Sequence, residues 1–113
     1  MPADANVNGD IFGGWLVSQM DLAAAITARQ RARGRIATVA IHALTFRKPV
    51  HIGDLICCYG TLQKVGHSSM TIDIEAWAVK SDTMEKYLVT EGCFVCVAID
   101  TQGKPRPVDL TPA

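Results

Sequence analysis

The sequence predicts an α+β fold in which one long helix packs against an antiparallel sheet. The stretch from Gly9 to Arg29 has the apolar, uninterrupted character of a buried helix. Four segments rich in β-branched residues follow it and are joined by short polar turns. Consecutive strands with short connections must pair antiparallel, because parallel neighbours need a long crossover. One helix then covers one face of the sheet.

The helical stretch contains an acid that its surroundings do not explain. Between Ile11 and Ala28 the only ionisable residue is Asp21. A surface helix has a broad charged face, so a helix without one is expected to be buried and wrapped by the sheet. A buried carboxylate is costly and often has a function, although a structural carboxylate that accepts backbone N–H bonds fits the pattern equally well.

The boundaries of the elements follow from local signals. We expect the helix to run from about Gly13 to Arg33, because an arginine-rich last turn followed by Gly34 is typical of a helix C-terminus. Alternation and turn residues predict strands at 35–46, 55–65, 70–80 and 85–100. Residues 103–113 are expected to form a basic, proline-bearing tail.

Length and composition favour one small domain that associates with copies of itself. The 113 residues suit a single domain, 1–113, with only a modest core. Hydrophobic residues make up 49% and charged residues 19%, so we expect much of the surface to be buried between copies. The 11 basic and 11 acidic side chains cancel, which argues against nucleic acid or an acidic membrane as a partner.

No targeting or membrane-spanning segment is recognised, so a cytoplasmic location is expected. No run approaches the roughly 18 apolar residues of a transmembrane helix. The first ten residues lack the basic and apolar regions of a signal peptide. The chain starts abruptly at a segment of functional character, which leaves open a short native N-terminal segment before Met1.

The four cysteines are expected to be reduced and structural, with no metal site. Cys93 and Cys96 have CxxC spacing but fall in a predicted strand. Residues three apart on a strand face opposite sides, so they cannot bind one metal ion together. Cys57 and Cys58 are adjacent and also point to opposite faces.

Several motifs occur in order along the chain: DANVNGDIFGGW at 4–15, SQMD at 18–21, FRKPV at 46–50, GD at 53–54, KVGHSS at 64–69 and VAID at 97–100. Over nearly the whole chain they resemble the hotdog-fold acyl-CoA thioesterases of the YciA type. The resemblance implies a long central helix wrapped by a curved antiparallel sheet, with the sheets of two copies paired in a dimer. It further implies a trimer of dimers that hydrolyses acyl-CoA to free acid and CoA, with no separate cofactor.

The resemblance assigns the chemistry to Asp21 of one subunit and Asn6 of the neighbouring subunit. A desolvated carboxylate is a stronger base. Asp21 therefore suits either deprotonation of water or direct attack on the thioester carbonyl, and the sequence leaves both open. Asn6 is expected to orient water or the substrate.

Two glycines and a serine complete the expected catalytic surroundings. Gly13 and Gly14 stand where the first helix amides lack intrahelical partners, and the Gly14 N–H is the favoured donor to the thioester oxygen. The alternative is that both glycines only permit tight packing. Ser18 lies on the helical face of Asp21, where it either hydrogen-bonds the carboxylate or water or simply packs.

CoA carries phosphates, so basic groups and turn amides are expected to meet it. The resemblance points to the segment that contains Lys64, Gly66, His67, Ser68 and Ser69. Related sequences commonly have arginine in place of His67. Because an imidazole is mostly neutral at pH 7, a phosphate contact there is expected to depend on pH. Other candidate basic residues are Arg47, Lys48, Lys104 and Arg106.

Two other functions stay open beside the thioesterase. One is a non-catalytic acyl-CoA binding or sensing module of the same fold, although a binder gains little from a buried acid. The other is a hydratase or dehydratase of this fold. Such enzymes usually place a histidine near the helix acid, and residues 9–33 contain none. The preferred acyl length is not predicted.

Overall fold

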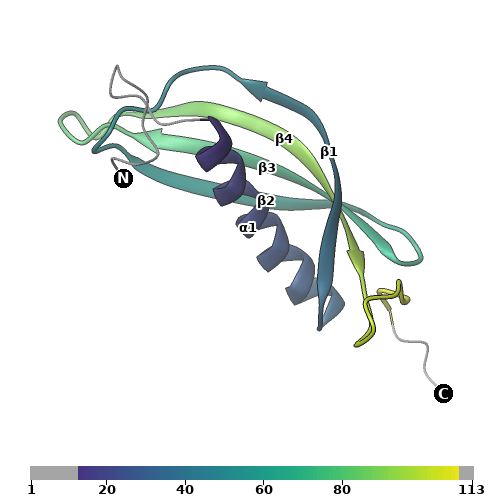
Figure 1. Ribbon diagram of the computed structural model, residues 1–113. Helices are drawn as coiled ribbons and strands as arrows, with labels where there is room; N and C mark the ends of the chain where they lie inside the picture. The colour runs from purple at the N-terminus through teal and green to yellow at the C-terminus, as the bar shows by residue number, and fades with distance from the viewer. Residues whose placement is uncertain (1–12, 110–113) are drawn as a thin grey trace.

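The computed structural model describes residues 13–109 as one helix packed on a curved four-stranded sheet (Figure 1). Helix α1 is followed by four strands, whose bounds are α1 Gly13–Ala32, β1 Ile36–Phe46, β2 Leu55–Val65, β3 Ser69–Val79 and β4 Lys86–Ala98. The strand order is β1-β4-β3-β2, and every neighbouring pair is antiparallel. The helix and the four antiparallel strands predicted from the sequence are therefore confirmed.

A single stripe of α1 makes the core with the sheet. Its buried residues recur every fourth position and are Leu16, Met20, Ala24, Ala28 and Ala32. The inward face of β3 supplies the other half through Met70, Ile72, Ile74, Ala76 and Ala78, all 0% exposed. Strand alternation produces this period of two, and the small alanines let the helix lie close to the sheet.

The expectation of a helix buried on all sides is not met within one chain. Leu22 and Ile26 on α1 are 59% and 55% exposed. Asp21 is half-buried. The four strands cover one side of α1, and Leu22 and Ile26 stay exposed on another side of the helix in a single copy.

The end of α1 differs from the expected glycine cap. Arg33 adopts the left-handed conformation, with φ of 57°, and its N–H donates to the Arg29 carbonyl at 2.8 Å. Gly34 serves a different purpose, because a Cβ there would lie 2.7 Å from a guanidinium nitrogen of Arg106. The glycine therefore makes room for an arginine that comes from far along the chain.

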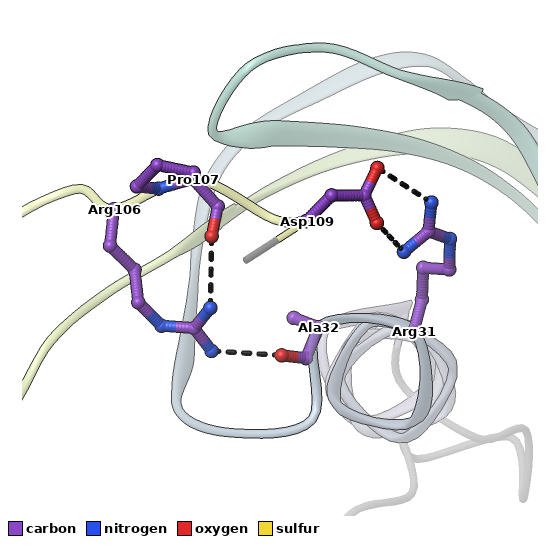
Figure 2. Close-up of polar contacts among 5 residues, drawn as sticks. All are labelled: Arg31, Ala32, Arg106, Pro107 and Asp109. Carbon is purple, nitrogen blue, oxygen red and sulfur yellow. Dashed lines mark hydrogen bonds and ion pairs between the residues drawn. The ribbon is translucent and has the colours of Figure 1, made fainter. Parts of the chain in front are cut away.

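The segment after β4 folds back onto the helix C-terminus instead of trailing away (Figure 2). The Arg106 guanidinium donates to the carbonyls of Ala32 and Pro107, each at 2.9 Å. Arg31 makes a two-pronged ion pair with Asp109, at 2.6 and 3.1 Å. The last carbonyls of a helix lack intrahelical donors, and Arg106 supplies a donor to one of these carbonyls, that of Ala32. Within the expected basic, proline-bearing tail, Arg106 and Asp109 are therefore held against the end of α1.

Two irregularities bend β1, which forms one edge of the sheet. The register slips between Thr38 and Ala40, which makes Val39 an extra residue, and slips again between His42 and Thr45. Ala43 in the second irregularity has φ of 50°. Bulges of this kind re-aim side chains and often lie near functional sites. Among residues 13–109, no helix has the length and apolar character needed to cross a membrane.

Candidate active site

Asp21 is held by a hydroxyl from the edge strand. Thr38 Oγ1 on β1 donates to Asp21 Oδ1 at 2.6 Å. Both side chains are half-buried. A hydrogen bond to an ionised carboxylate is stronger than one between neutral groups, so it fixes the orientation of the carboxylate. Among residues 13–109, no hydrogen bond to Oδ2 accompanies the one to Oδ1.

The sequence analysis did not identify Thr38. A signal for it was present, because strand alternation puts Thr38 on the same face as Ile36, which packs against the core. A hydroxyl on the inward face of a strand that covers an apolar helix needs a polar partner. Asp21 is the acidic residue of that helix, so strand alternation and this acid together point to the contact.

A buried thiol lies behind Thr38. Cys96 on β4 is directly opposite Thr38 in the ladder, is 0% exposed, and has its Sγ 3.7 Å from Thr38 Oγ1. Burial raises the pKa of the Cys96 thiol, and the negative charge of Asp21 raises it further. Cys96 is therefore a protonated thiol at neutral pH.

The two glycines at the start of α1 have different surroundings. A Cβ on Gly13 would lie 3.1 Å from the ring of Phe46, so Gly13 lets the end of β1 pack against the helix. A Cβ on Gly14 would meet nothing within 4 Å. The packing explanation therefore suits Gly13, while among the described residues no side chain or backbone crowds the Cα of Gly14.

Gly14 and Asp21 of one chain lie too far apart to act on the same carbonyl group. They are separated by two helical turns, which is about 10.5 Å along the axis. The N–H groups of a helix point toward its N-terminus, so the Gly14 N–H points away from Asp21. Within one chain, the Asp21 carboxylate and the Gly14 amide therefore cannot contact the same substrate carbonyl.

The other predicted catalytic residues have separate positions. The Ser18 hydroxyl donates to the Trp15 carbonyl at 2.6 Å, within the helix. Asn6 lies outside the described residues. Neither is brought to Asp21 by the contacts of the described chain.

The predicted CoA-binding segment forms the turn between β2 and β3. The Gly66 N–H donates to the Ser69 carbonyl at 2.8 Å. The carbonyls of His67 and Ser68 accept from Val108 and Ala98, both at 2.8 Å. The backbone of the turn is therefore held by β4 and by the segment that follows it.

The exposed groups of this turn lie at the Asp21 end of the sheet. The side chains of Lys64 and His67 are exposed. Met70, just after the turn, pairs with Cys96, which pairs with Thr38. The N-terminus of α1 lies at the other end, against Phe46.

Two of the other candidate basic residues have partners within the chain. Arg47 Nε donates to Glu91 at 3.0 Å, and the Arg106 guanidinium binds backbone carbonyls. Lys48 lies 5.9 Å from the ring centroid of Tyr87 and lines a cavity of about 280 Å³ at the N-terminus of α1. In the part of the chain that the structure describes, no cluster of His, Cys, Asp and Glu is arranged to hold a metal ion.

Comparison with known proteins finds similarity to thioesterases, both in a family model and in a bacterial relative. The sequence model of the Thioesterase superfamily matches residues 8–85. The acyl-CoA thioester hydrolase YciA of Salmonella typhimurium is 50% identical over 113 residues, which cover 97% of this chain and 85% of that protein.

Two solved structures have nearly the same backbone. The hexameric thioesterase y2039 of Yersinia pestis superposes with a TM-score of 0.93 at 51% identity, covering 97% of this chain and 90% of that one. An aspartate-to-alanine variant of HI0827, a hexameric broad specificity acyl-coenzyme A thioesterase, gives 0.93 at 46% identity, covering 96% and 81%.

Proposed function

Because the chain belongs to the thioesterase superfamily, we propose that it hydrolyses acyl-CoA thioesters to a free carboxylic acid and CoA. The observation that carries the proposal is the half-buried Asp21, oriented by Thr38, on a helix whose residues 13–32 include no histidine. Relatives at about half identity over nearly the whole chain carry names for this activity. The free thiols of its four cysteines fit the reducing cytoplasm.

In the proposed reaction Asp21 supplies the base or the nucleophile. As a base, Oδ2 takes a proton from water while the resulting hydroxide attacks the thioester carbon. The tetrahedral oxyanion collapses, the C–S bond breaks, and the CoA sulfur leaves and is protonated. As a nucleophile, Oδ2 attacks the same carbon and forms a mixed anhydride that water then hydrolyses.

Isotope labelling separates these two mechanisms. A single turnover in water enriched in ¹⁸O puts the label only in the product acid if Asp21 acts as a base. Label found in the carboxylate of Asp21 itself, by mass spectrometry of the peptide that contains it, rules out the simple general-base mechanism.

We propose that each site combines two subunits. The separation of Gly14 and Asp21 along one helix, about 10.5 Å, supports a donor that comes from the partner copy. The partner's loop would also contribute its Asn6. A symmetric dimer would hold two such sites, and three dimers would make a hexamer like those named among the relatives.

Subunit complementation tests the shared site. Chains carrying Asp21→Ala and chains carrying Asn6→Ala are each expected to be inactive, but co-expressed chains form mixed dimers with one intact site. Random pairing predicts recovery of about one quarter of wild-type activity. No recovery in isolated mixed dimers would mean that both residues act from the same chain.

CoA is proposed to bind at the β2–β3 turn. Lys64 exposes an ammonium group there and His67 exposes an imidazole. The small residues Gly66, Ser68 and Ser69 take part in the backbone hydrogen bonds that hold the turn. Ser18 and Gly13 would line the approach to the helix. The assignment of the turn residues is supported by the position of the turn at the Asp21 end of the sheet.

The deciding experiment measures CoA release from a panel of acyl-CoA esters of increasing acyl length. The wild type is expected to release CoA, and Asp21→Asn is expected to abolish release while binding persists. A wild type that binds acyl-CoA without hydrolysing any member of the panel would instead be the binding module. A wild-type rate for Asp21→Asn would refute the assigned role of Asp21.

A further inference from the structure

The hydroxyl of Thr38 has room for one more hydrogen-bond donor. A threonine hydroxyl carries one proton and two lone pairs. An ionised carboxylate can only accept, so the contact of 2.6 Å to Asp21 Oδ1 uses the proton of Thr38. The oxygen can then accept from a second group.

Cys96 is placed to be that donor. Its Sγ lies 3.7 Å from Thr38 Oγ1. Among the described residues, these two side chains, Asp21 and Cys96, are the polar groups that contact the hydroxyl. Because Thr38 already donates to Asp21, the sulfur must be the donor in this second contact.

The strand register supports a fixed arrangement of the pair. Thr38 and Cys96 are directly opposite in the β1–β4 ladder, and the bulge at Val39 begins just after Thr38. The thiol is 0% exposed, so water does not compete for its proton. Burial also keeps the pKa of Cys96 above its ordinary value, which preserves the S–H group.

We propose that Cys96 is a positioning residue for hydrolysis: its S–H donates to Thr38, which directs the threonine proton onto Asp21. The three groups form a chain in which each hydrogen bond polarises the next. The inference rests on the proposed function, because its effect is exerted through Asp21. A cysteine that merely fills space would affect stability without acting through Thr38.

A mutant cycle distinguishes these two roles. Cys96→Ala is expected to lower kcat by about two- to fivefold, the range for a weak S–H···O bond, with KM unchanged. Cys96→Ser retains a donor and is expected to keep kcat near wild type. In a Thr38→Val background, Cys96→Ala is expected to lower kcat no further. Cys93→Ala is the matched control, because Cys93 is three residues away on the other face of β4.

Infrared spectroscopy tests the donor in the intact protein, whatever the stability of the Cys96 variants. The S–H stretching band of Cys96, assigned by its loss in Cys96→Ala or Cys96→Ser, is expected to move to higher frequency in Thr38→Val. An unchanged band, equal losses of kcat in Cys96→Ser and Cys96→Ala, or additive losses in the double variant would overturn the proposal. Asp21→Asn at wild-type kcat would instead refute the catalytic role of Asp21 and this inference together, and a wild type that hydrolyses no acyl-CoA would refute the proposed function.

Discussion

At the residue scale, Thr38 orients Asp21, the carboxylate that we propose to be catalytic. One carboxylate oxygen is held at 2.6 Å by the hydroxyl, which leaves the other oxygen for water or substrate. A carboxylate on an unsupported helix surface rotates among several rotamers, and the hydroxyl selects one of them. The contact therefore sets the direction from which Asp21 acts.

Thr38→Val is expected to lower kcat by about 10- to 100-fold, because it removes a hydrogen bond to a charged group. Steady-state hydrolysis of acyl-CoA measures the effect. Thr38→Ser keeps the hydroxyl and is expected to remain within about threefold of wild type. Equal losses in the two variants would show that the methyl group, rather than the hydroxyl, is what matters.

His67 offers a second residue-level prediction. His67→Arg places a permanent positive charge on the exposed turn, so KM for acyl-CoA is expected to fall by about two- to tenfold at pH 7. Gln102→Arg adds the same charge on another exposed turn and serves as the control. A KM that moves equally in both variants would reflect general attraction of an anionic substrate.

The residue-level site was only partly predictable from the sequence. Asp21 was identifiable because one acid stands alone in an apolar helix. Thr38 was not identified, because its partner becomes clear only when the strand is placed against the helix. Cys96 looked like half of a CxxC motif, whereas its inward position makes it a neighbour of Thr38.

At the element scale, the C-terminal segment holds both the helix and the proposed CoA-binding turn. Arg106 and Asp109 contact the end of α1 (Figure 2). The Val108 N–H donates to the His67 carbonyl. Val108 is 3% exposed and is part of the core cluster. A segment of few residues thus links two elements that lie far apart in the sequence.

The Arg31–Asp109 pair predicts a small pH dependence of stability. The hydrogen bond from Arg31 lowers the pKa of Asp109 from its ordinary value of 3.8. A carboxylate with a lowered pKa stabilises the fold above 3.8, and this stabilisation is lost as the pH falls through the lowered pKa. Asp109→Asn is therefore expected to lower Tm at pH 7 on the order of 1 °C, a difference that shrinks toward about pH 3.

Calorimetry at several pH values measures this difference. The companion variant Arg31→Gln is expected to lower Tm similarly and to remove any further effect of Asp109→Asn. A Tm difference that is constant from neutral to acid pH would mean that the ion pair does not contribute.

The elements themselves were predictable, and their irregularities were not. The predicted helix and strands agree with the observed bounds to within about two residues. The bulges of β1 and the left-handed Arg33 leave no local signal, because neither Val39, Ala43 nor Arg33 is a glycine or asparagine, the residues that usually mark such backbone. Gly34 appeared to be a cap because its true neighbour, Arg106, is distant in sequence.

At the scale of the whole molecule, a single copy leaves apolar surface uncovered. Leu22, Ile26, Val39 and Leu55 are between 55% and 62% exposed. The radius of gyration is 16.0 Å, compared with about 13 Å for a compact domain of this length. Both edge strands, β1 and β2, also present unpaired backbone groups. These features are those of a subunit that is completed by other copies.

Ile41→Lys is expected to weaken the assembly. Ile41 lies on edge strand β1 and is 40% exposed in one copy, so a second copy that covers it would bury the new charge. Sedimentation velocity should show smaller species, and activity should fall with them. Met84→Lys adds the same charge at a residue 71% exposed in the β3–β4 turn and is expected to leave the assembly intact.

The spacing of Gly14 and Asp21 along α1 has a consequence for how activity depends on concentration. If each site needs a carboxylate from one copy and an amide from another, an isolated subunit has no complete site. When the protein is diluted below the dissociation constant of the dimer, the reaction rate should then fall more steeply than the enzyme concentration. Specific activity would rise with enzyme concentration and reach a plateau, and acyl-CoA would itself promote assembly, because it binds only to the joined form.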